Sequence, residues 1–299
     1  MTEIAPGAWA AALTPLNADL SIDVEAYLAH VRNLLGGGCD GVAALGTTGE
    51  ANSFSVSERL ALIDALGAAA LPAERVMIGV GCCAAPDTIA LTRAALAAGY
   101  PNVLMLPPFY YKNVTDEGVF RAFADVIERV GDSRLRVIVY DFPQMTGVTF
   151  SAALLKRLAD AFKGVVVGVK DSSGDWPAME AALAQLPGFL VFAGSERFLL
   201  PTLRAGGPGC ISATANVTYA ALAGLVARWR ETDAGARQET ITARRLALQR
   251  FPMVPMLKEI MANKTGQPRW RTLRPPLVNL SGDDAASVLE QARRLDLLG

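Results

Sequence analysis

The strongest constraint on the fold is a regular alternation of short apolar runs with helical patterns. The apolar runs recur about every thirty residues, and such short runs between turns are typical of strands buried on both faces. They lie at 8–13, 41–45, 76–80, 102–106, 136–140, 165–170, 189–193 and 210–213. Helical patterns follow them at 22–35, 56–70, 86–98, 116–130, 151–162, 175–186, 196–205 and 217–229.

Eight strand–helix units within about 230 residues predict an α/β chain folded as a (β/α)8 TIM barrel. Helix-start signals support this, because Ser55 is followed three residues later by Glu58, as in a capping box. A doubly wound parallel sheet is the alternative, but no GxGxxG fingerprint follows the first apolar run.

The alternation stops after residue 231. The rest of the chain is mostly helical in pattern, at 239–247, 253–264 and 283–297. We therefore predict two parts, a catalytic barrel at 1–231 and a C-terminal helical region at 232–299. The apolar positions of these last helices need a surface to cover, so we expect them to pack against the barrel or another subunit of an oligomer.

Composition argues against nucleic-acid and membrane partners. The formal net charge is −1, which provides no basic footprint for nucleic acid or acidic lipid. No apolar stretch approaches the roughly 20 residues that span a bilayer, and residues 1–6 lack the basic start of a secretory signal. The basic cluster at 269–274 is short and is expected to form a solvated or intersubunit loop. These features indicate a cytoplasmic location.

The chain is poor in metal ligands. Its only histidine, His30, lies in a helical stretch far from the polar strand ends, which indicates a structural role. The four cysteines, at 39, 82, 83 and 210, form no CxxC pair, and two adjacent cysteines cannot readily chelate one zinc ion. They are expected to be buried free thiols. We expect no metal.

Lys170 is the most informative candidate residue. It ends the apolar run 165–170 and precedes the polar segment 171–174, so it should lie at the carboxyl end of a strand, where barrel enzymes carry their active sites. Desolvation disfavours the ammonium form, and a neutral amine can attack a carbonyl to form a Schiff base. A lysine that only reaches water from a strand end would give the same local sequence.

Other strand ends carry groups suited to the same chemistry. The second apolar run ends in Gly-Thr-Thr-Gly-Glu at 46–50, where N–H and hydroxyl groups can converge on a carboxylate. The segment lacks the GK[ST] ending of a phosphate loop, although it could simply cap a helix. The fifth run ends in Tyr140, which can donate or relay a proton or be a buried core residue. Together with Lys170, these groups predict carbonyl chemistry.

Three motifs carry a family resemblance. Gly-Thr-Thr-Gly-Glu at 46–50, Tyr-Asp-Phe-Pro at 140–143 and Gly-Val-Lys-Asp-Ser at 168–172 resemble the signatures of the dihydrodipicolinate synthase/N-acetylneuraminate lyase family, and the likeness covers essentially the whole chain. The resemblance implies a (β/α)8 enzyme without metal or cofactor. It also implies a homotetramer built as a dimer of dimers, which joins pyruvate or another 2-oxo acid to a lysine as an imine.

The resemblance also implies roles for individual residues. Lys170 would be the Schiff-base nucleophile, and Tyr140 would shuttle protons to and from the imine and the substrate hydroxyl. Thr47 would link the tyrosines by hydrogen bonds, and Tyr111 would complete the proton relay of a neighbouring subunit. Thr47 and Thr48 would hold the substrate carboxylate, Thr48 most directly.

The backbone carbonyl of Ile211 would, by the same resemblance, face the bound pyruvate. Two departures from the family pattern bear on the second substrate. Asp141 replaces the usual asparagine after the motif tyrosine. Met145 replaces the arginine that, in the synthase branch, grips the carboxylate of aspartate semialdehyde, and a methionine cannot make that contact.

The segment after the seventh apolar run bears on sugar binding. The sialic acid lyase branch carries two acidic residues after the glycine, whereas here Gly194 is followed by Ser195, Glu196 and Arg197. We therefore expect an aldolase for 2-oxo-3-deoxy sugar acids, in which Gly194 lines the site and Ser172, Ser195 and Glu196 meet hydroxyls. Arg197 would meet a distal carboxylate, or it would cap or pair on the following helix.

Three other functions stay open. The chain could be a 4-hydroxy-tetrahydrodipicolinate synthase, or a sugar-acid dehydratase that uses the same imine. It could also be a non-catalytic sensor of 2-oxo acids. A sensor does not need a nucleophile, so the presence of Lys170, Tyr140 and both threonines favours an enzyme acting on a small 2-oxo acid and an aldehyde.

Overall fold

Eight parallel strands form a closed barrel in the computed structural model, which describes residues 4–298. Each strand pairs with the next along the chain, and β8 pairs with β1. The strands are β1 Gly7–Ala11, β2 Gly41–Ala44, β3 Val76–Gly79, β4 Asn102–Met105, β5 Arg136–Asp141, β6 Val166–Asp171, β7 Leu190–Ala193 and β8 Gly209–Ser212. The predicted TIM barrel is confirmed, and the doubly wound alternative is wrong. The prediction that residues 1–6 do not begin a secretory signal falls partly on residues 1–3, which lie outside the described residues. Gly299 also lies outside them.

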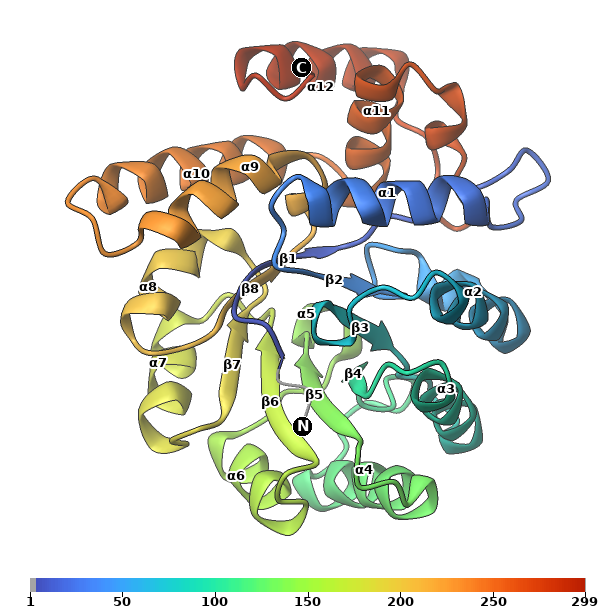
Figure 1. The fold of residues 1–299 in the computed structure, drawn as a ribbon, viewed down its shortest axis with the longest axis vertical. Helices are drawn as coiled ribbons and strands as arrows, with labels where there is room; N and C mark the ends of the chain where they lie inside the picture. Colours follow the sequence, from blue (N-terminus) through green and yellow to red (C-terminus); the bar gives the residue numbers. More distant parts are fainter. Residues whose placement is uncertain (1–3, 299) are drawn as a thin grey trace.

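Helices surround the strands (Figure 1). They are α1 Val24–Gly36, α2 Val56–Ala68, α3 Ala85–Ala97, α4 Asp116–Val130, α6 Ala152–Ala161, α7 Trp176–Gln185, α8 Leu199–Arg204 and α9 Ala215–Arg228. The capping box predicted at the start of α2 is present, since Ser55 and Glu58 bond reciprocally. The predicted helix at 196–205 is instead divided into a 3-10 turn, η3 Glu196–Phe198, and the short α8. No helix in the described part of the chain has the length and apolar character needed to cross a bilayer.

The barrel interior is a packed core. Side chains from successive strands fill it, and they include Trp9, Ala43, Met77, Leu104, Ile138, Tyr140, Phe192 and Ile211. Trp9 meets Phe192 edge to face, with ring centroids 6.2 Å apart. Because the interior is filled, substrates can reach the barrel only at the ends of its strands.

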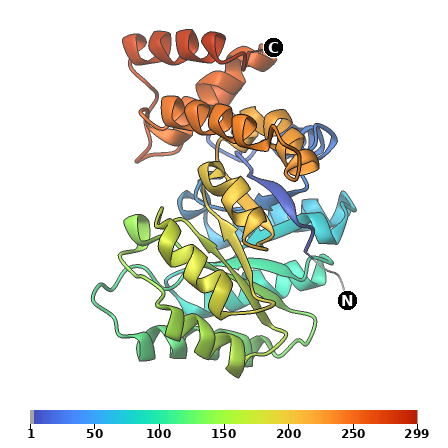
Figure 2. The same cartoon turned by 90° about the vertical axis from the view of Figure 1, so that its left-hand side faces the viewer.

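The C-terminal helical region covers one side of the barrel. Its helices are α10 Ala234–Leu248, α11 Met253–Thr265 and α12 Gly282–Arg294. Figures 1 and 2 show α11 and α12 stacked beyond α1 and α10. Met256, Leu257 and Ile260 of α11 share a buried cluster with Leu13 and Val217 of the barrel. Packing of these helices on the barrel is confirmed, whereas the division into two domains near residue 231 stays a prediction.

The basic cluster at 269–274 is only partly exposed, so the expectation of a solvated loop was wrong for Trp270 and Arg274, whereas an intersubunit position stays a prediction. The side chain of Trp270 is buried and meets the His30 ring edge to face, with centroids 5.0 Å apart. Arg274 donates hydrogen bonds to the carbonyls of Leu20, at 2.8 and 3.0 Å, and Ser53, at 2.8 Å, and pairs with Glu58. The aromatic ring and the guanidinium each have partners within the chain, which explains their burial.

His30 and the cysteines have no common site. His30 is buried and bonds Asn216 at 2.8 Å, and burial lowers its pKa to about 4, which fits the structural role predicted for it. Cys39 and Cys210 are buried as expected, but Cys83 is exposed and Cys82 half-buried. Within residues 4–298, no three His, Cys, Asp or Glu side chains are grouped closely enough to hold a metal ion.

Candidate active site

Lys170 and Tyr140 lie side by side on neighbouring strands. The register of β5 and β6 pairs Tyr140 directly with Lys170. Both residues are 4 % exposed, and the Lys170 Nζ lies 4.1 Å from the centroid of the Tyr140 ring. Phe142 stacks against the same tyrosine, with centroids 5.7 Å apart. The lysine therefore does not extend to water, and its amine is held over an aromatic face at the carboxyl end of the barrel.

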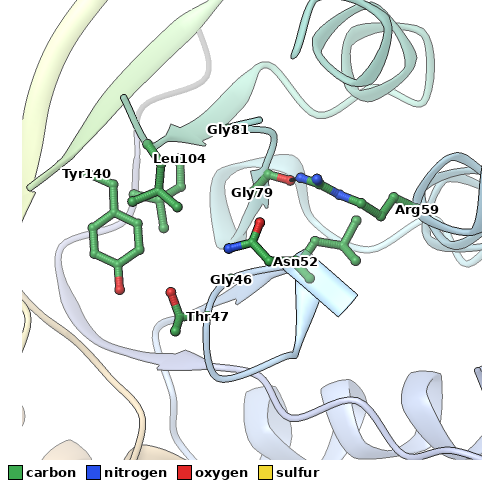
Figure 3. Close-up of a pocket in the computed structure, with 11 residues that line it drawn as sticks. Gly46, Thr47, Asn52, Arg59, Gly79, Gly81, Leu104 and Tyr140 are labelled. Carbon is green, nitrogen blue, oxygen red and sulfur yellow. Dashed lines mark hydrogen bonds between the residues drawn. The ribbon is translucent and has the colours of Figure 1, made fainter. Parts of the chain in front are cut away.

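Thr47 completes a polar group with Tyr140. It lies in the turn after β2 and lines one pocket together with Tyr140, Gly46 and Leu104. Figure 3 shows the hydroxyls of Thr47 and Tyr140 pointing toward one another. Thr48, the next residue, is 7 % exposed. The structure therefore brings the predicted threonine turn and the tyrosine to the same end of the barrel.

The end of β8 lies between β7 and β1 in the closed barrel. Ile211 is fully buried and belongs to the same interior cluster as Tyr140. Its neighbour Ser212 contacts the Glu196 carboxylate, which also contacts the Thr214 hydroxyl. The backbone position of Ile211 is thus tied to side chains that follow β7.

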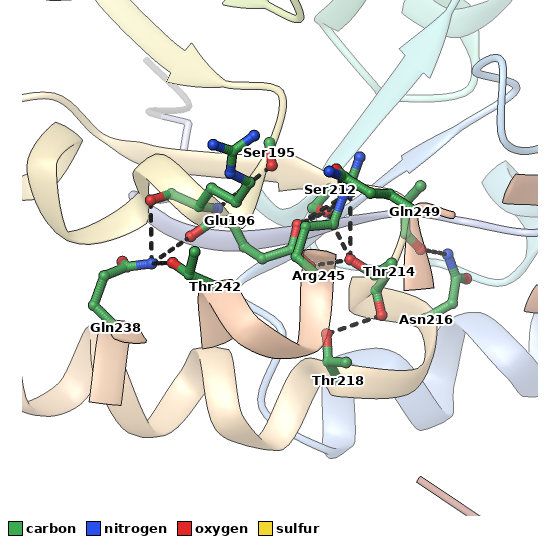
Figure 4. Close-up of polar contacts among 12 residues, drawn as sticks. Ser195, Glu196, Ser212, Thr214, Asn216, Thr218, Gln238, Thr242, Arg245 and Gln249 are labelled. Carbon is green, nitrogen blue, oxygen red and sulfur yellow. Dashed lines mark hydrogen bonds and ion pairs between the residues drawn. The ribbon is translucent and has the colours of Figure 1, made fainter. Parts of the chain in front are cut away.

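Glu196 is the centre of a buried polar network (Figure 4). It is 1 % exposed, and besides Ser212 and Thr214 its carboxylate meets Arg245 Nη1 of α10 at 3.2 Å. Gln238 of α10 donates to the Glu196 carbonyl at 3.0 Å. Since both carboxylate oxygens already have partners, the expected contact between Glu196 and a substrate hydroxyl stays a prediction.

Gly194 allows the ends of β6 and β7 to approach closely. A side chain there would begin 2.1 Å from Ser172 Oγ and 2.7 Å from the Asp171 carbonyl, too close for any other residue. The Gly194 N–H donates to that same carbonyl at 2.6 Å. Ser172 and Gly194 are therefore neighbours, as the predicted site requires, while Arg197 packs over Phe198 with its guanidinium carbon 5.4 Å from the ring centroid.

Tyr111 stands apart from this group. It lies after β4, its side chain is 74 % exposed, and its ring packs edge to face on Tyr110 with centroids 5.3 Å apart. It is not among the residues that line the pocket with Thr47 and Tyr140. Met145 is also exposed. The role expected for Tyr111, which needs a neighbouring subunit, stays a prediction.

Asp141 and Asp171 form a second pair on the same two strands, one residue further along each. Because side chains alternate along a strand, they point away from the barrel interior that holds Tyr140 and Lys170. Burial, and then the nearby Asp171 carboxylate, raise the pKa of Asp141 to about 7. Burial also raises the pKa of Asp171, opposed by hydrogen bonds from Ser173 N and Oγ at 2.8 and 2.6 Å.

Two residues that contact the site were missed by sequence reasoning. Arg245 of α10 pairs with Glu196, and Lys258 of α11 pairs with Glu50, the last residue of the threonine turn. Neither cation lies near a motif in the sequence. The only available signal was Glu50 itself, a carboxylate in a motif otherwise suited to bind an anion.

A closed (β/α)8 barrel with a buried lysine beside a tyrosine at its carboxyl end defines the class I aldolase type of enzyme. A family model described as the dihydrodipicolinate synthetase family matches residues 5–294. This chain belongs to that family, whose members are lyases, and it is a class I aldolase or lyase.

Individual relatives span the whole chain. A DapA-like lyase of Chloroflexus aurantiacus is 34% identical over 97% of this chain and 96% of its own length. The dihydrodipicolinate synthase structure from Agrobacterium tumefaciens str. C58 is 35% identical with a TM-score of 0.89, covering 97% of this chain and 99% of that one. YagE of Escherichia coli K12, solved with pyruvate, is 28% identical with a TM-score of 0.88, covering 98% and 99%. The name of YagE proposes a 2-dehydro-3-deoxy-D-gluconate aldolase.

Proposed function

We propose that this enzyme makes or cleaves a bond to C3 of pyruvate through an imine on Lys170, and that its substrates are 2-oxo-3-deoxy sugar acids. The observation that carries this proposal is the buried Lys170 amine, 4.1 Å from the centroid of the Tyr140 ring on the adjacent strand. A buried amine beside a phenol is suited to carbonyl condensation and proton transfer. No metal or organic cofactor is required for this chemistry.

The proposed cleavage runs in three steps. The Lys170 amine attacks the C2 carbonyl, and Tyr140 gives its phenol proton to the departing hydroxyl, so that water leaves and a protonated imine remains beside the Tyr140 phenolate. The C3–C4 bond then breaks, its electron pair moves toward the imine nitrogen as an enamine, and the Tyr140 phenolate takes the proton of the C4 hydroxyl, which leaves as an aldehyde. After the aldehyde departs, a proton returns to C3 and water releases pyruvate from Lys170.

Binding of the 2-oxo acid is assigned to the threonine turn and to β8. The Thr48 hydroxyl and the backbone N–H groups of the turn would hold the carboxylate, with Thr47 bridging toward Tyr140. The Ile211 carbonyl would face the bound pyruvate. Ser172 and Ser195 would meet hydroxyls of the sugar chain, whereas the existing contacts of Glu196 support a role in holding the end of β8.

The choice of a sugar acid over aspartate semialdehyde rests on Met145. A thioether cannot make a charge-assisted bond to a second carboxylate, and this side chain is exposed. The name of YagE supports the same choice, while the Agrobacterium relative supports the synthase as second candidate. Dehydration through the same imine and a non-catalytic sensor stay as alternatives. A homotetramer and a cytoplasmic location stay predictions.

The first experiment is intact-mass spectrometry after incubation with pyruvate and borohydride. Reduction of the imine should add about 72 Da per chain, and Lys170→Ala should not gain this mass. An unmodified wild-type protein that nevertheless binds pyruvate would reject the aldolase and favour the sensor.

A second experiment separates the two enzymes. Turnover of pyruvate with glyceraldehyde is compared with turnover of pyruvate with aspartate semialdehyde. We expect the first pair to be preferred, and a preference for the second would identify the synthase. A Met145→Arg variant should shift the ratio toward aspartate semialdehyde, because it supplies the missing cation.

A further inference from the structure

Glu50 ends the threonine turn in an unfavourable backbone conformation. Its φ is 58° and its ψ is 26°, in the left-handed region where a side chain is strained. The turn is tight, with Gly49 N–H bonded to the Gly46 carbonyl and Glu50 N–H to the Thr47 carbonyl, each at 3.1 Å. Some contact must hold Glu50 in this conformation, and the placement of Thr47 and Thr48 depends on it.

Residues of the C-terminal helical region hold the Glu50 side chain. Lys258 Nζ of α11 pairs with Glu50 Oε1 and donates to the Thr272 carbonyl at 2.8 Å. The Arg274 N–H donates to Glu50 Oε2 at 3.1 Å. Both side chains of the Glu50–Lys258 pair are 0 % exposed. The turn is therefore fixed from outside the barrel.

Burial makes this pair sensitive to the loss of either partner. Removing a cation from a buried pair leaves a carboxylate without compensation, and the chain must then move to bring water to it. Burial lowers the pKa of Lys258, and the Glu50 carboxylate opposes that change. A carboxylate released from Lys258 would also release the left-handed backbone that ends the threonine turn.

We propose that Lys258 is a positioning residue for the 2-oxo acid carboxylate, which acts through Glu50 on the turn that carries Thr47 and Thr48. The proposal rests on the proposed function, because it assigns the carboxylate to that turn. It predicts that loss of Lys258 weakens capture of pyruvate, while the chemistry of Lys170, which lies on β6, stays possible at saturating pyruvate.

The test measures the pyruvate concentration that gives half-maximal borohydride-trapped adduct. Lys258→Met should raise this concentration about tenfold or more, while the adduct at saturation stays on Lys170. The double variant Lys258→Met/Glu50→Gln carries no unpaired buried charge, so it should recover to within about threefold of wild type. A double variant as impaired as Lys258→Met would show that Lys258 does not act through Glu50, and would overturn the proposal.

Arg271→Met is the matched control. Arg271 pairs with Glu259 of α11 at 2.7 Å, so the control breaks an ion pair of the same region that does not include Glu50. It should leave the half-maximal concentration unchanged. If Lys258→Met does not fold, Glu50→Gln alone, which keeps the size of the side chain, should still raise that concentration, and no change would count against the proposal.

Hydrogen exchange separates this proposal from the proposed function. In the protein without ligand, the amides of residues 46–51 should exchange faster in Lys258→Met than in wild type or Arg271→Met. Faster exchange without any wild-type adduct would reject the aldolase chemistry but keep the anchoring of the turn. A wild-type adduct with unchanged exchange and half-maximal concentration in Lys258→Met would reject the positioning role alone.

Discussion

The barrel buries carboxylates in two ways. After β2 and β7 each buried carboxylate lies beside a cation, whereas at the ends of β5 and β6 two carboxylates lie beside one another. Glu50 and Glu196 each pair with a cation from the C-terminal helices, Lys258 and Arg245. At the β5–β6 edge, Asp141 faces a second carboxylate, and its Oδ1 has no hydrogen-bond partner among residues 4–298. The paired glutamates are held as fixed anchors, whereas burial without a cation makes Asp141 a group that gains its proton near neutral pH.

The largest expected effect comes from breaking the Glu196–Arg245 pair. Arg245→Met leaves a carboxylate that is 1 % exposed without its cation, so the free energy of unfolding should fall by about 3–5 kcal/mol. Chemical denaturation at pH 7 measures this change. The double variant Arg245→Met/Glu196→Gln should recover most of the loss, and equal losses in both variants would show that charge burial is not the cause.

Replacing Asp141 should have a smaller effect on the free energy of unfolding, and this effect should be stabilising. The pKa of Asp141 is raised from 3.8 to about 7, so the folded protein holds this proton more tightly than the unfolded chain. Stability should therefore fall as pH rises from about 4 to 7, and the full cost is present above pH 7. Asp141→Asn removes this cost and should raise the free energy of unfolding at pH 8 by about 2–4 kcal/mol.

The matched measurement for Asp141→Asn is the same denaturation experiment near pH 4. There the folded protein keeps the proton and the unfolded chain holds it for somewhat less than half of the time, so most of the gain from asparagine should vanish. A gain that is equal at pH 4 and pH 8 would mean that packing, and not ionisation, distinguishes the variant.

Asp171→Asn should have a milder effect. It removes the negative charge that helps to raise the pKa of Asp141, so that pKa should move down but stay above its usual range, because burial is the larger cause. The pH dependence of stability should shift to lower pH accordingly. Carboxyl NMR of the variant, with Asp141→Asn to assign the signal, checks the direction, and an unmoved midpoint would show that the two aspartates are not coupled.

The smallest effect is expected at a surface ion pair. Lys156 and Asp160 lie 2.6 Å apart on α6, but their side chains are 61% and 66% exposed. Lys156→Ala should change the free energy of unfolding by less than about 0.5 kcal/mol. If Lys156→Ala lowered the free energy of unfolding as much as Arg245→Met, burial would not be the reason why the ion pairs of Glu50 and Glu196 stabilise the fold.

The strands and the central pair of the site could be predicted because their signals are local. A buried strand of a barrel is a short apolar run, and the active end of a barrel is where those runs end, so the sequence places Lys170 and Tyr140 there, while their roles came from the resemblance. The helix at 239–247 was predicted too short, since α10 begins at Ala234. Its first turns are largely polar, and the apolar pattern starts later.

The ion pairs that hold Glu50 and Glu196 could not be predicted in the same way. Lys258 and Arg245 reach the barrel only because α10 and α11 dock on it in one orientation, and an apolar helix face does not specify which charged residues meet which loop. Glu196 was expected to face the substrate, yet the neighbouring end of β8 supplies hydroxyls to its carboxylate. Contacts between distant segments depend on the assembled fold, which no local pattern encodes.

The anchoring by α10 and α11 decides where this chain could be cut. A fragment that stops at residue 231 would keep every strand of the barrel together with Lys170, Tyr140 and both threonines. It would lose the cations that neutralise Glu50 and Glu196, and therefore the ion pairs that hold the loops after β2 and β7. The smallest unit that can preserve the geometry of this site therefore extends through α11, well beyond the last strand.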